Sequence, residues 1–159
     1  KSAVIRDIAR DSRLALANVA LKQGDFAAAV ESLEEILDEF PRDAGALNDL
    51  AYLWMERGMH LARAASMAER AVAAEPANPS YRESLGWGYF LLGRYGEAVC
   101  ELTRAAEKDP GGVILDHLGD AHLKAGDSAK AREAWRRAAE AFEKDGDKEK
   151  LEAVRGKLK

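Results

Sequence analysis

Two histidines and two aspartates lie close together in one helical-looking segment: His117, His122, Asp116 and Asp120. Imidazole nitrogens and carboxylate oxygens are common ligands of zinc and other divalent ions. Five residues, however, place the two histidine side chains about 140° apart around a helix, so they cannot face one ion. The two aspartates share a helix face, but a solvated acidic surface is the better interpretation. The sequence therefore predicts no metal site and no cofactor.

Nucleophilic catalysis would depend on Cys100, the only cysteine of the chain. The cysteine lies in a helical pattern between Val99 and Leu102, and the repeat phase described below brings no histidine near it. We therefore interpret it as a small packing residue. A lone cysteine also excludes an internal disulfide and a thiolate metal cluster. Since no glycine-rich phosphate loop, HExxH helix or GxSxG turn occurs, the sequence does not predict an enzyme.

The composition favours helices over strands. Of the 159 residues, 47% are hydrophobic and 33% are charged, which is the balance of a soluble folded protein. Ala, Leu, Glu, Arg and Lys recur throughout, and these are good helix formers. Val, Ile, Thr and the aromatic residues are too scattered for a sheet. The elements that carry any functional residue should therefore all be helices.

Charge and hydropathy exclude two kinds of partner. The formal net charge is −4, so no basic surface is available to displace counterions from nucleic-acid phosphates. The longest apolar stretch, near 86–93, is far shorter than the roughly 20 residues that a membrane span needs. The chain begins at Lys1 rather than at a methionine, so we expect it to be an excised part of a longer or processed protein.

Glycines recur at regular intervals of 34, 35 and 33 residues, at Gly24, Gly58, Gly93 and Gly126. Three of these glycines begin similar sequence segments: GDFAAAVESL, GRYGEAVCEL and GDSAKAREAW. A proline closes each of the first three units 17 or 18 residues later, at Pro41, Pro76 and Pro110. This period is typical of stacked helical hairpins.

The pattern resembles the tetratricopeptide repeat family, whose unit of 34 residues forms a helix, a turn and a second helix. The third unit carries the family residues Leu85, Gly86, Tyr89, Ala98, Ala105 and Pro110, although Arg82 stands where the family has tryptophan. The fourth unit carries Leu115, Leu118, Gly119, His122, Ala131, Trp135 and Ala138. The resemblance covers about residues 10–143. It implies an all-α, right-handed α-solenoid of about four such units with a C-terminal capping helix.

Small residues recur where two helices of a unit must approach each other. On the first helices these are Ala17, Ala51, Gly86 and Gly119, and on the second helices Ala29, Ala64, Ala98 and Ala131. The tryptophans Trp54 and Trp135 fall on packing positions, and His122 holds a position that usually packs. A single hairpin cannot bury its apolar face alone, so stability should come from stacking.

We expect one domain over 1–159, with units at about 10–42, 43–77, 78–110 and 111–143. The predicted helix pairs are 11–23 and 26–39, 43–57 and 60–74, 78–92 and 95–108, and 112–125 and 128–144. Residues 3–10 either lengthen the first helix or belong to the remnant of a preceding unit. Asp147 is a candidate N-cap for a capping helix over about 147–158, and a linker is the alternative.

The resemblance implies a concave groove lined by the first helix of each unit. The family's groove positions, carried over residue by residue, hold Asn18, Asn48, Tyr52, Met55, Glu83, Trp87, Phe90, Asp116 and Asp120. Tyr52 and Trp87 hold equivalent places in adjacent units, so we expect their rings side by side as binding anchors. The alternative is that Trp87 packs against the neighbouring hairpin or a terminal helix.

The charges around these rings indicate the chemistry of a ligand. Acidic side chains predominate, so we expect a peptide with an apolar or aromatic side chain and a basic flank. The family's clamp for a C-terminal carboxylate uses Lys, Asn and Arg side chains. Only Asn18 matches here, since the other clamp places hold Leu14, Asp49, Ser80 and Ser84. An acidic tail is therefore not the expected ligand.

The function that the resemblance implies is a scaffold or adaptor that binds a partner protein or peptide. One alternative is assembly with copies of itself through the open solenoid end or the groove. Another is a non-catalytic repeat region attached to an enzyme. Strings such as SLGWGYFLLGRYGEAV look most like bacterial repeat proteins, so a soluble protein of the bacterial cytoplasm or cell envelope is expected.

Overall fold

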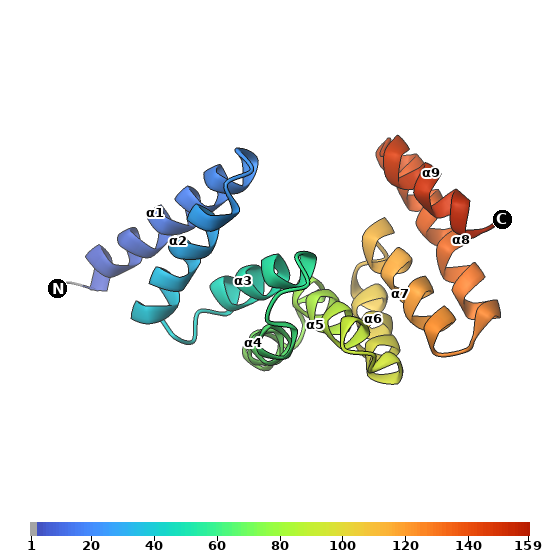
Figure 1. The fold of residues 1–159 in the computed structure, drawn as a ribbon, viewed down its shortest axis with the longest axis horizontal. Coiled ribbons are helices and arrows are strands. Elements are labelled where there is room, and N and C mark those ends of the chain that lie inside the picture. Colours follow the sequence, from blue (N-terminus) through green and yellow to red (C-terminus); the bar gives the residue numbers. More distant parts are fainter. Residues whose placement is uncertain (1–2) are drawn as a thin grey trace. The chain divides into compact units, whose positions relative to one another are not determined.

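The computed structural model describes residues 3–159, and this range contains nine α-helices and no strand (Figure 1). The helices are α1 (Ala3–Lys22), α2 (Phe26–Glu39), α3 (Ala44–Glu56), α4 (Leu61–Ala74), α5 (Pro79–Leu91), α6 (Tyr95–Lys108), α7 (Gly112–Lys124), α8 (Ser128–Asp145) and α9 (Lys148–Lys157). Helices α1–α4 form one compact unit and α5–α9 form a second. The all-α prediction is confirmed.

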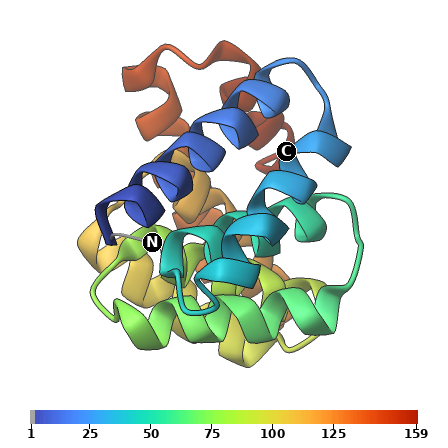
Figure 2. The same cartoon turned by 90° about the vertical axis from the view of Figure 1, so that its left-hand side faces the viewer.

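The helices pair as the repeat pattern predicts. Within the first unit α1 packs on α2 and α3 on α4, and within the second α5 packs on α6 and α7 on α8. Figure 2 turns the first unit towards the viewer and shows α1 and α2 side by side. Most predicted bounds agree to within about two residues. Helix α1 instead begins at Ala3, so residues 3–10 lengthen the first helix.

Side-chain caps and left-handed glycines set where the helices begin. The Asp25, Asp43, Asn78, Asp127 and Asp147 side chains each accept a hydrogen bond from a backbone N–H of the helix that follows. The four repeat glycines all have positive φ, between +64° and +92°, which explains why a residue without Cβ recurs there. The second repeat, which forms α3 and α4 in the first compact unit, has one extra residue in this turn. There His60 adopts a φ of +49°, and its ring contacts Trp54 edge-on at 4.9 Å.

The predicted small residues do allow close helix approach. In the second unit, a Cβ added to Gly86 would lie 2.6 Å from Cγ of Leu102 on α6. A Cβ on Gly119 would lie 2.4 Å from both Cδ1 and Nε1 of Trp135 on α8. The four predicted alanines of the second helices are 0% exposed, and the packing tryptophans Trp54 and Trp135 are only 3% and 4% exposed. These contacts build the core of each unit from within its own hairpins.

The predicted capping helix is present as α9, which packs on α8 and buries Leu151 and Val154. Asp147 is its N-cap, accepting a hydrogen bond from the backbone N–H of Lys150 at 3.1 Å. In residues 3–159 no helix combines the length and the apolar character needed to cross a membrane.

The packing role predicted for Cys100 is wrong, because its side chain is exposed. Its neighbour Leu102 is fully buried. Two residues correspond to about 200° of rotation on a helix, so a buried Leu102 turns Cys100 towards solvent.

Candidate partner-binding surface

Three aromatic rings meet between α5 and α7 of the second unit. Trp87 and Phe90 lie one turn apart on α5, and their rings stack with centroids 4.7 Å apart and planes 9° apart. The His117 ring of α7 stacks on Trp87 at 4.0 Å and 10°. All three side chains are half-buried. We call Trp87, Phe90 and His117 the aromatic cluster.

Glu83 holds His117 in this stack. Its Oε1 lies 2.7 Å from Nδ1 of His117, and both side chains are largely buried. Glu83 and Trp87 are four residues apart on α5, so they share one helix face. A carboxylate that binds one ring nitrogen sets the orientation of the imidazole plane. The cluster is therefore held in place before any ligand arrives.

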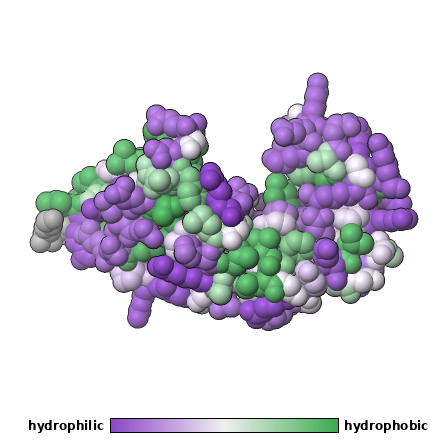
Figure 3. Space-filling model, viewed as in Figure 1, coloured by the Kyte–Doolittle hydropathy of each residue, from purple (hydrophilic) through white to green (hydrophobic). Residues whose placement is uncertain are grey.

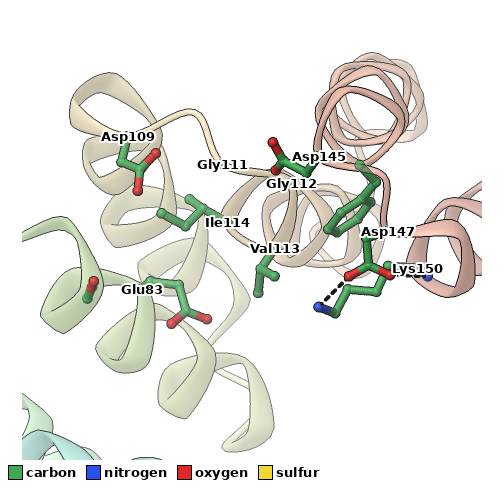
Figure 4. A pocket seen from close by; sticks show the side chains of 11 residues that line it. Glu83, Asp109, Gly111, Gly112, Val113, Ile114, Asp145, Asp147 and Lys150 are labelled. Atoms are coloured by element: carbon green, nitrogen blue, oxygen red, sulfur yellow. Dashed lines mark hydrogen bonds and ion pairs between the residues drawn. The ribbon is translucent and has the colours of Figure 1, made fainter.

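The same Glu83 also lines an open cavity of about 350 Å³. Figure 4 shows its carboxylates arranged around the N-terminal end of α7 and the turn between α8 and α9. The polar lining consists of Ser80, Glu83, Asp109, Asp145, Asp147 and Lys150, and the apolar lining includes Val113, Ile114 and Phe142. Lys150 is paired with Asp147 at 2.8 Å. Four carboxylates and one ammonium, above an apolar wall, suit a cationic side chain with an aliphatic stem.

The predicted groove residues Asp116 and Asp120 already bind an ammonium group of the chain itself. Nζ of Lys157, in α9, lies 2.7 Å from Oδ1 of Asp116 and 2.8 Å from Oδ1 of Asp120. Asp120 also accepts a hydrogen bond from Nε1 of Trp135 at 3.2 Å. Partial burial opposes the charge on Lys157, but these carboxylates raise the pKa of its ammonium group. Lys157 thus neutralises part of the negative charge of Asp116 and Asp120, so these two carboxylates are engaged within the chain rather than open to a ligand.

The predicted groove residues of the first unit differ in how much surface they present. Asn18 is exposed and Tyr52 is half-buried. Met55 is only 2% exposed, so it contributes packing rather than contact surface. Asn48 is 9% exposed; its Nδ2 donates to Asp49 at 3.2 Å, and its Oδ1 is without a hydrogen-bond partner among the described residues. Tyr52 and Trp87 belong to different units, and their adjacency stays a prediction.

Several residues of this surface were not among the predicted groove residues: His117, Lys157, Asp109, Asp145 and Asp147. His117 directly follows the predicted Asp116 on α7, and only the structure shows that its ring reaches Trp87. Asp109, Asp145 and Asp147 lie in or next to turns, which the family's groove positions leave out. Within residues 3–159, no group of three or more His, Cys, Asp and Glu side chains is placed to hold a metal ion.

His122 is half-buried beside the α7–α8 turn, as expected for a packing position. Burial lowers the pKa of its imidazole below the ordinary 6.5, although Asp127 and Glu133 oppose this shift. The unfolded chain therefore binds a proton more readily than the folded chain, so stability present above pH 6.5 is lost as the pH falls towards the folded-state pKa.

His122→Tyr, which restores the family's usual residue, should remove this part of the pH dependence. The measurement is the urea midpoint of wild type and variant between about pH 8 and pH 5. Equal slopes of midpoint against pH in the two proteins would contradict the assignment.

Consecutive antiparallel hairpins with small residues at their contacts and a polar terminal helix define a helical repeat protein. Residues 14–60, 60–113 and 117–156 match the family model described as Tetratricopeptide repeat. The chain belongs to the tetratricopeptide repeat family, and its fold class is the α-solenoid of that family. Members of the family typically mediate protein–protein interaction or self-assembly.

Two curated relatives are named after the same repeat. Human Tetratricopeptide repeat protein 13 is 27% identical over 134 residues, which are 82% of this chain and 16% of the relative. The TPR repeat-containing protein PA4667 of Pseudomonas aeruginosa is 28% identical over 102 residues, which are 64% of this chain and 17% of the relative. The matched region thus spans about a sixth of the length of each relative.

Solved structures show the same fold at low identity. TTC0263, a thermophilic TPR protein of Thermus thermophilus, matches with a TM-score of 0.73 and 21% identity over 94% of this chain and 89% of its own. MamA AMB-1 matches with a TM-score of 0.71 and 23% identity, over 84% of this chain and 79% of its own. A Thermobaculum terrenum O-GlcNAc transferase mutant matches with a TM-score of 0.80 and 23% identity, over 89% of this chain and 27% of its own.

Proposed function

We propose that this chain is a non-catalytic adaptor that binds a peptide segment of a partner protein on the second unit. The observation that carries the proposal is the position of Glu83. It holds the aromatic cluster through His117, and it lines the acidic cavity. An apolar recognition element and a cationic one therefore adjoin on one surface.

The aromatic cluster would receive an apolar or aromatic side chain of the partner. Trp87 is half-buried and stacked on two rings, so little conformational entropy remains to be lost when it contacts a ligand. Stacking also limits how much of the Trp87 ring surface a ligand can contact. Since Phe90 and His117 already cover ring surface, the ligand would meet the remaining exposed part of the cluster. Trp87 would therefore have both roles that the sequence suggested: it packs against the neighbouring hairpin through His117, and it contacts the ligand.

The acidic cavity would receive a lysine or arginine side chain of the same partner segment. Asp109 and Asp145 line it and form no ion pair with any described residue. A basic flank on the ligand therefore remains the expected complement, with the cavity as its site in place of the Asp116–Asp120 pair. Exposed rim charges act mainly on association rate and salt dependence.

The first unit, taken by itself, offers Asn48 as a candidate contact to an extended backbone. Its buried Oδ1 has no donor among the described residues, and a buried acceptor left without a donor costs about 1–3 kcal/mol. Because this atom is buried, an N–H group of a bound segment could offset that cost only after the Asn48 side chain turns outward. Asn18, exposed on α1, would contribute more weakly.

Affinity capture from the source organism tests the adaptor role. We expect wild type to retain a specific prey, and Trp87→Ala to weaken its binding by about 10- to 100-fold, as for a central aromatic hot spot. Glu107→Ala, at an exposed position of α6 in the same unit, is the matched control and should bind as wild type does. Unchanged affinity in Trp87→Ala, measured with the purified prey, would refute the anchor.

The cavity is tested separately by Asp109→Asn combined with Asp145→Asn. These changes keep the shape of the side chains and remove two charges, so affinity should fall and its dependence on salt should weaken. If affinity falls in this double variant and stays unchanged in Trp87→Ala, recognition depends on charge alone.

A further inference from the structure

Helix α1 exposes an apolar face. Val4, Ile5, Ile8, Leu16 and Val19 are each between 49% and 63% exposed. At 100° per residue these side chains cover only about a third of the helix circumference, opposite the side that packs on α2. Figure 3 shows hydrophobic side chains at the surface over α1. Five large apolar side chains exposed on one face form a contiguous apolar patch, a feature that marks an interaction surface.

Equivalent positions in other hairpins are buried. Leu16 directly precedes the small residue Ala17, as Leu50 precedes Ala51 and Leu118 precedes Gly119. Leu16 is 61% exposed, whereas Leu50 is 0% and Leu118 is 6% exposed. Helices α3 and α7, which carry the buried leucines, pack against the second helix of the hairpin before them. The exposed face of α1 thus carries apolar residues of the kind that α3 and α7 bury against a neighbouring helix, and no described residue covers it.

Four of the five residues of this face are spaced symmetrically along the helix. Ile5, Ile8, Leu16 and Val19 lie at −7, −4, +4 and +7 residues from Ser12. A two-fold axis that pairs two such helices antiparallel through Ser12 sets Ile8 against Leu16 of the second copy and Ile5 against Val19 of the second copy. Spacings of three and four residues are those of a helix–helix seam.

The residue at the centre of the face is compatible with burial. The hydroxyl of Ser12 donates a hydrogen bond to the backbone carbonyl of Ile8 at 2.8 Å. Its donor is therefore satisfied within the helix and does not need water. Arg13, which follows Ser12 in the sequence, is turned towards α2, where it pairs with Glu35 at 2.9 Å and with Glu39 at 3.2 Å.

We propose that the apolar face of α1 binds the same face of a second copy of this chain, forming a two-fold antiparallel dimer. Helix α9 does not offer a matching surface, because it covers α8 and exposes charged side chains, among them Lys148, Glu149, Glu152 and Arg155. Because an apolar face gains little from a charged one, pairing of α1 with α1 is favoured over pairing of α1 with α9. The proposal is independent of the adaptor function.

Sedimentation velocity over a range from about 1 μM to 0.5 mM tests the dimer. Wild type should shift from monomer to dimer and no further. Leu16→Glu should raise the dimer dissociation constant by at least about 100-fold, because each dimer would bury two carboxylates. Leu123→Glu, at a 46% exposed position on α7, is the matched control and should dimerise as wild type does. Circular dichroism verifies that both variants keep their helix content.

Cross-linking tests the axis itself. In a Cys100→Ser background, Ser12→Cys should form an intermolecular disulfide under mild oxidation, because the axis sets the two Ser12 positions opposite each other. Glu34→Cys, exposed on α2, should not. The proposal is overturned by a constant monomer mass, by growth beyond the dimer, by a Leu16→Glu variant that dimerises as well as wild type, or by equal cross-linking at the two positions.

Discussion

Replacing Trp135 with alanine is expected to lower the free energy of unfolding by about 3–5 kcal/mol, the range for removing a buried aromatic side chain. Trp135 is 4% exposed and lies in the core of the second unit. Its ring also packs directly against Gly119, where an added Cβ would lie 2.4 Å from two ring atoms. Since its Nε1 donates to Asp120, the change should in addition loosen the contact between Asp120 and Lys157.

Chemical denaturation followed by far-ultraviolet circular dichroism measures this effect. Trp135→Phe is the control: it retains most of the packing and loses the hydrogen bond to Asp120, so the loss should be closer to about 1 kcal/mol. An alanine variant as stable as the phenylalanine variant would contradict the packing role.

Replacing Gly119 with alanine should destabilise the chain by about 1–3 kcal/mol, although alanine is the better helix former by about 1 kcal/mol. The added Cβ would lie 2.4 Å from two atoms of Trp135. At that distance either the ring or the whole of α7 must move. The steric cost of this close contact therefore outweighs the gain in helix propensity.

Gly156→Ala is the matched control, because a Cβ at that position of α9 has no atom within 4 Å. There the helix propensity acts alone, so stability should rise by about 0.5–1 kcal/mol. The two substitutions are chemically identical and should have opposite signs. In a Trp135→Leu background the Gly119→Ala loss should largely disappear, since the two positions are in contact. A loss of the same size in that background would show that the strain lies elsewhere.

Local patterns predicted the hairpins well. Helix bounds, the N-cap Asp147 and the glycines of the turns depend on neighbours within a few residues, which the sequence displays directly. The close approaches at Gly86 and Gly119 could also be predicted, because a repeat places the same small residue at the same contact in every unit. The exposure of Cys100 was missed, although the predicted packing residues Ala98 and Ala105 already turn the opposite side of α6, with Cys100, towards solvent.

The recognition surface could be predicted only in part. Glu83, Trp87 and Phe90 follow from the groove positions of the family. In the structure Trp87 and Phe90 belong to the aromatic cluster, and Glu83 lies beside it and contacts His117. The stacking of His117 and the pairing of Lys157 with Asp116 and Asp120 depend on how helices dock over separations of about one repeat or more. No local pattern carries that information, and a charge that looks free in sequence can be neutralised by a distant residue.

The structure places the aromatic cluster on rigid helices, with Glu83 as its support. Sites built on helices keep their geometry better than sites built on loops. The acidic cavity is different, since Asp109 and Asp147 lie in turns at the helix ends. We therefore expect the cluster to supply a fixed anchor and the cavity to adapt to the position of the basic side chain.

The most direct test of the adaptor account is a titration of the isotopically labelled chain with its captured partner, followed through the three indole N–H signals in a proton–nitrogen correlation spectrum. Trp54 is buried in the first unit and serves as an internal reference. The account predicts that the Trp87 signal shifts or broadens in proportion to saturation while the Trp54 signal stays in place. A saturated complex in which Trp87 does not respond, with the changes confined to α6, α8 or α9, would contradict it.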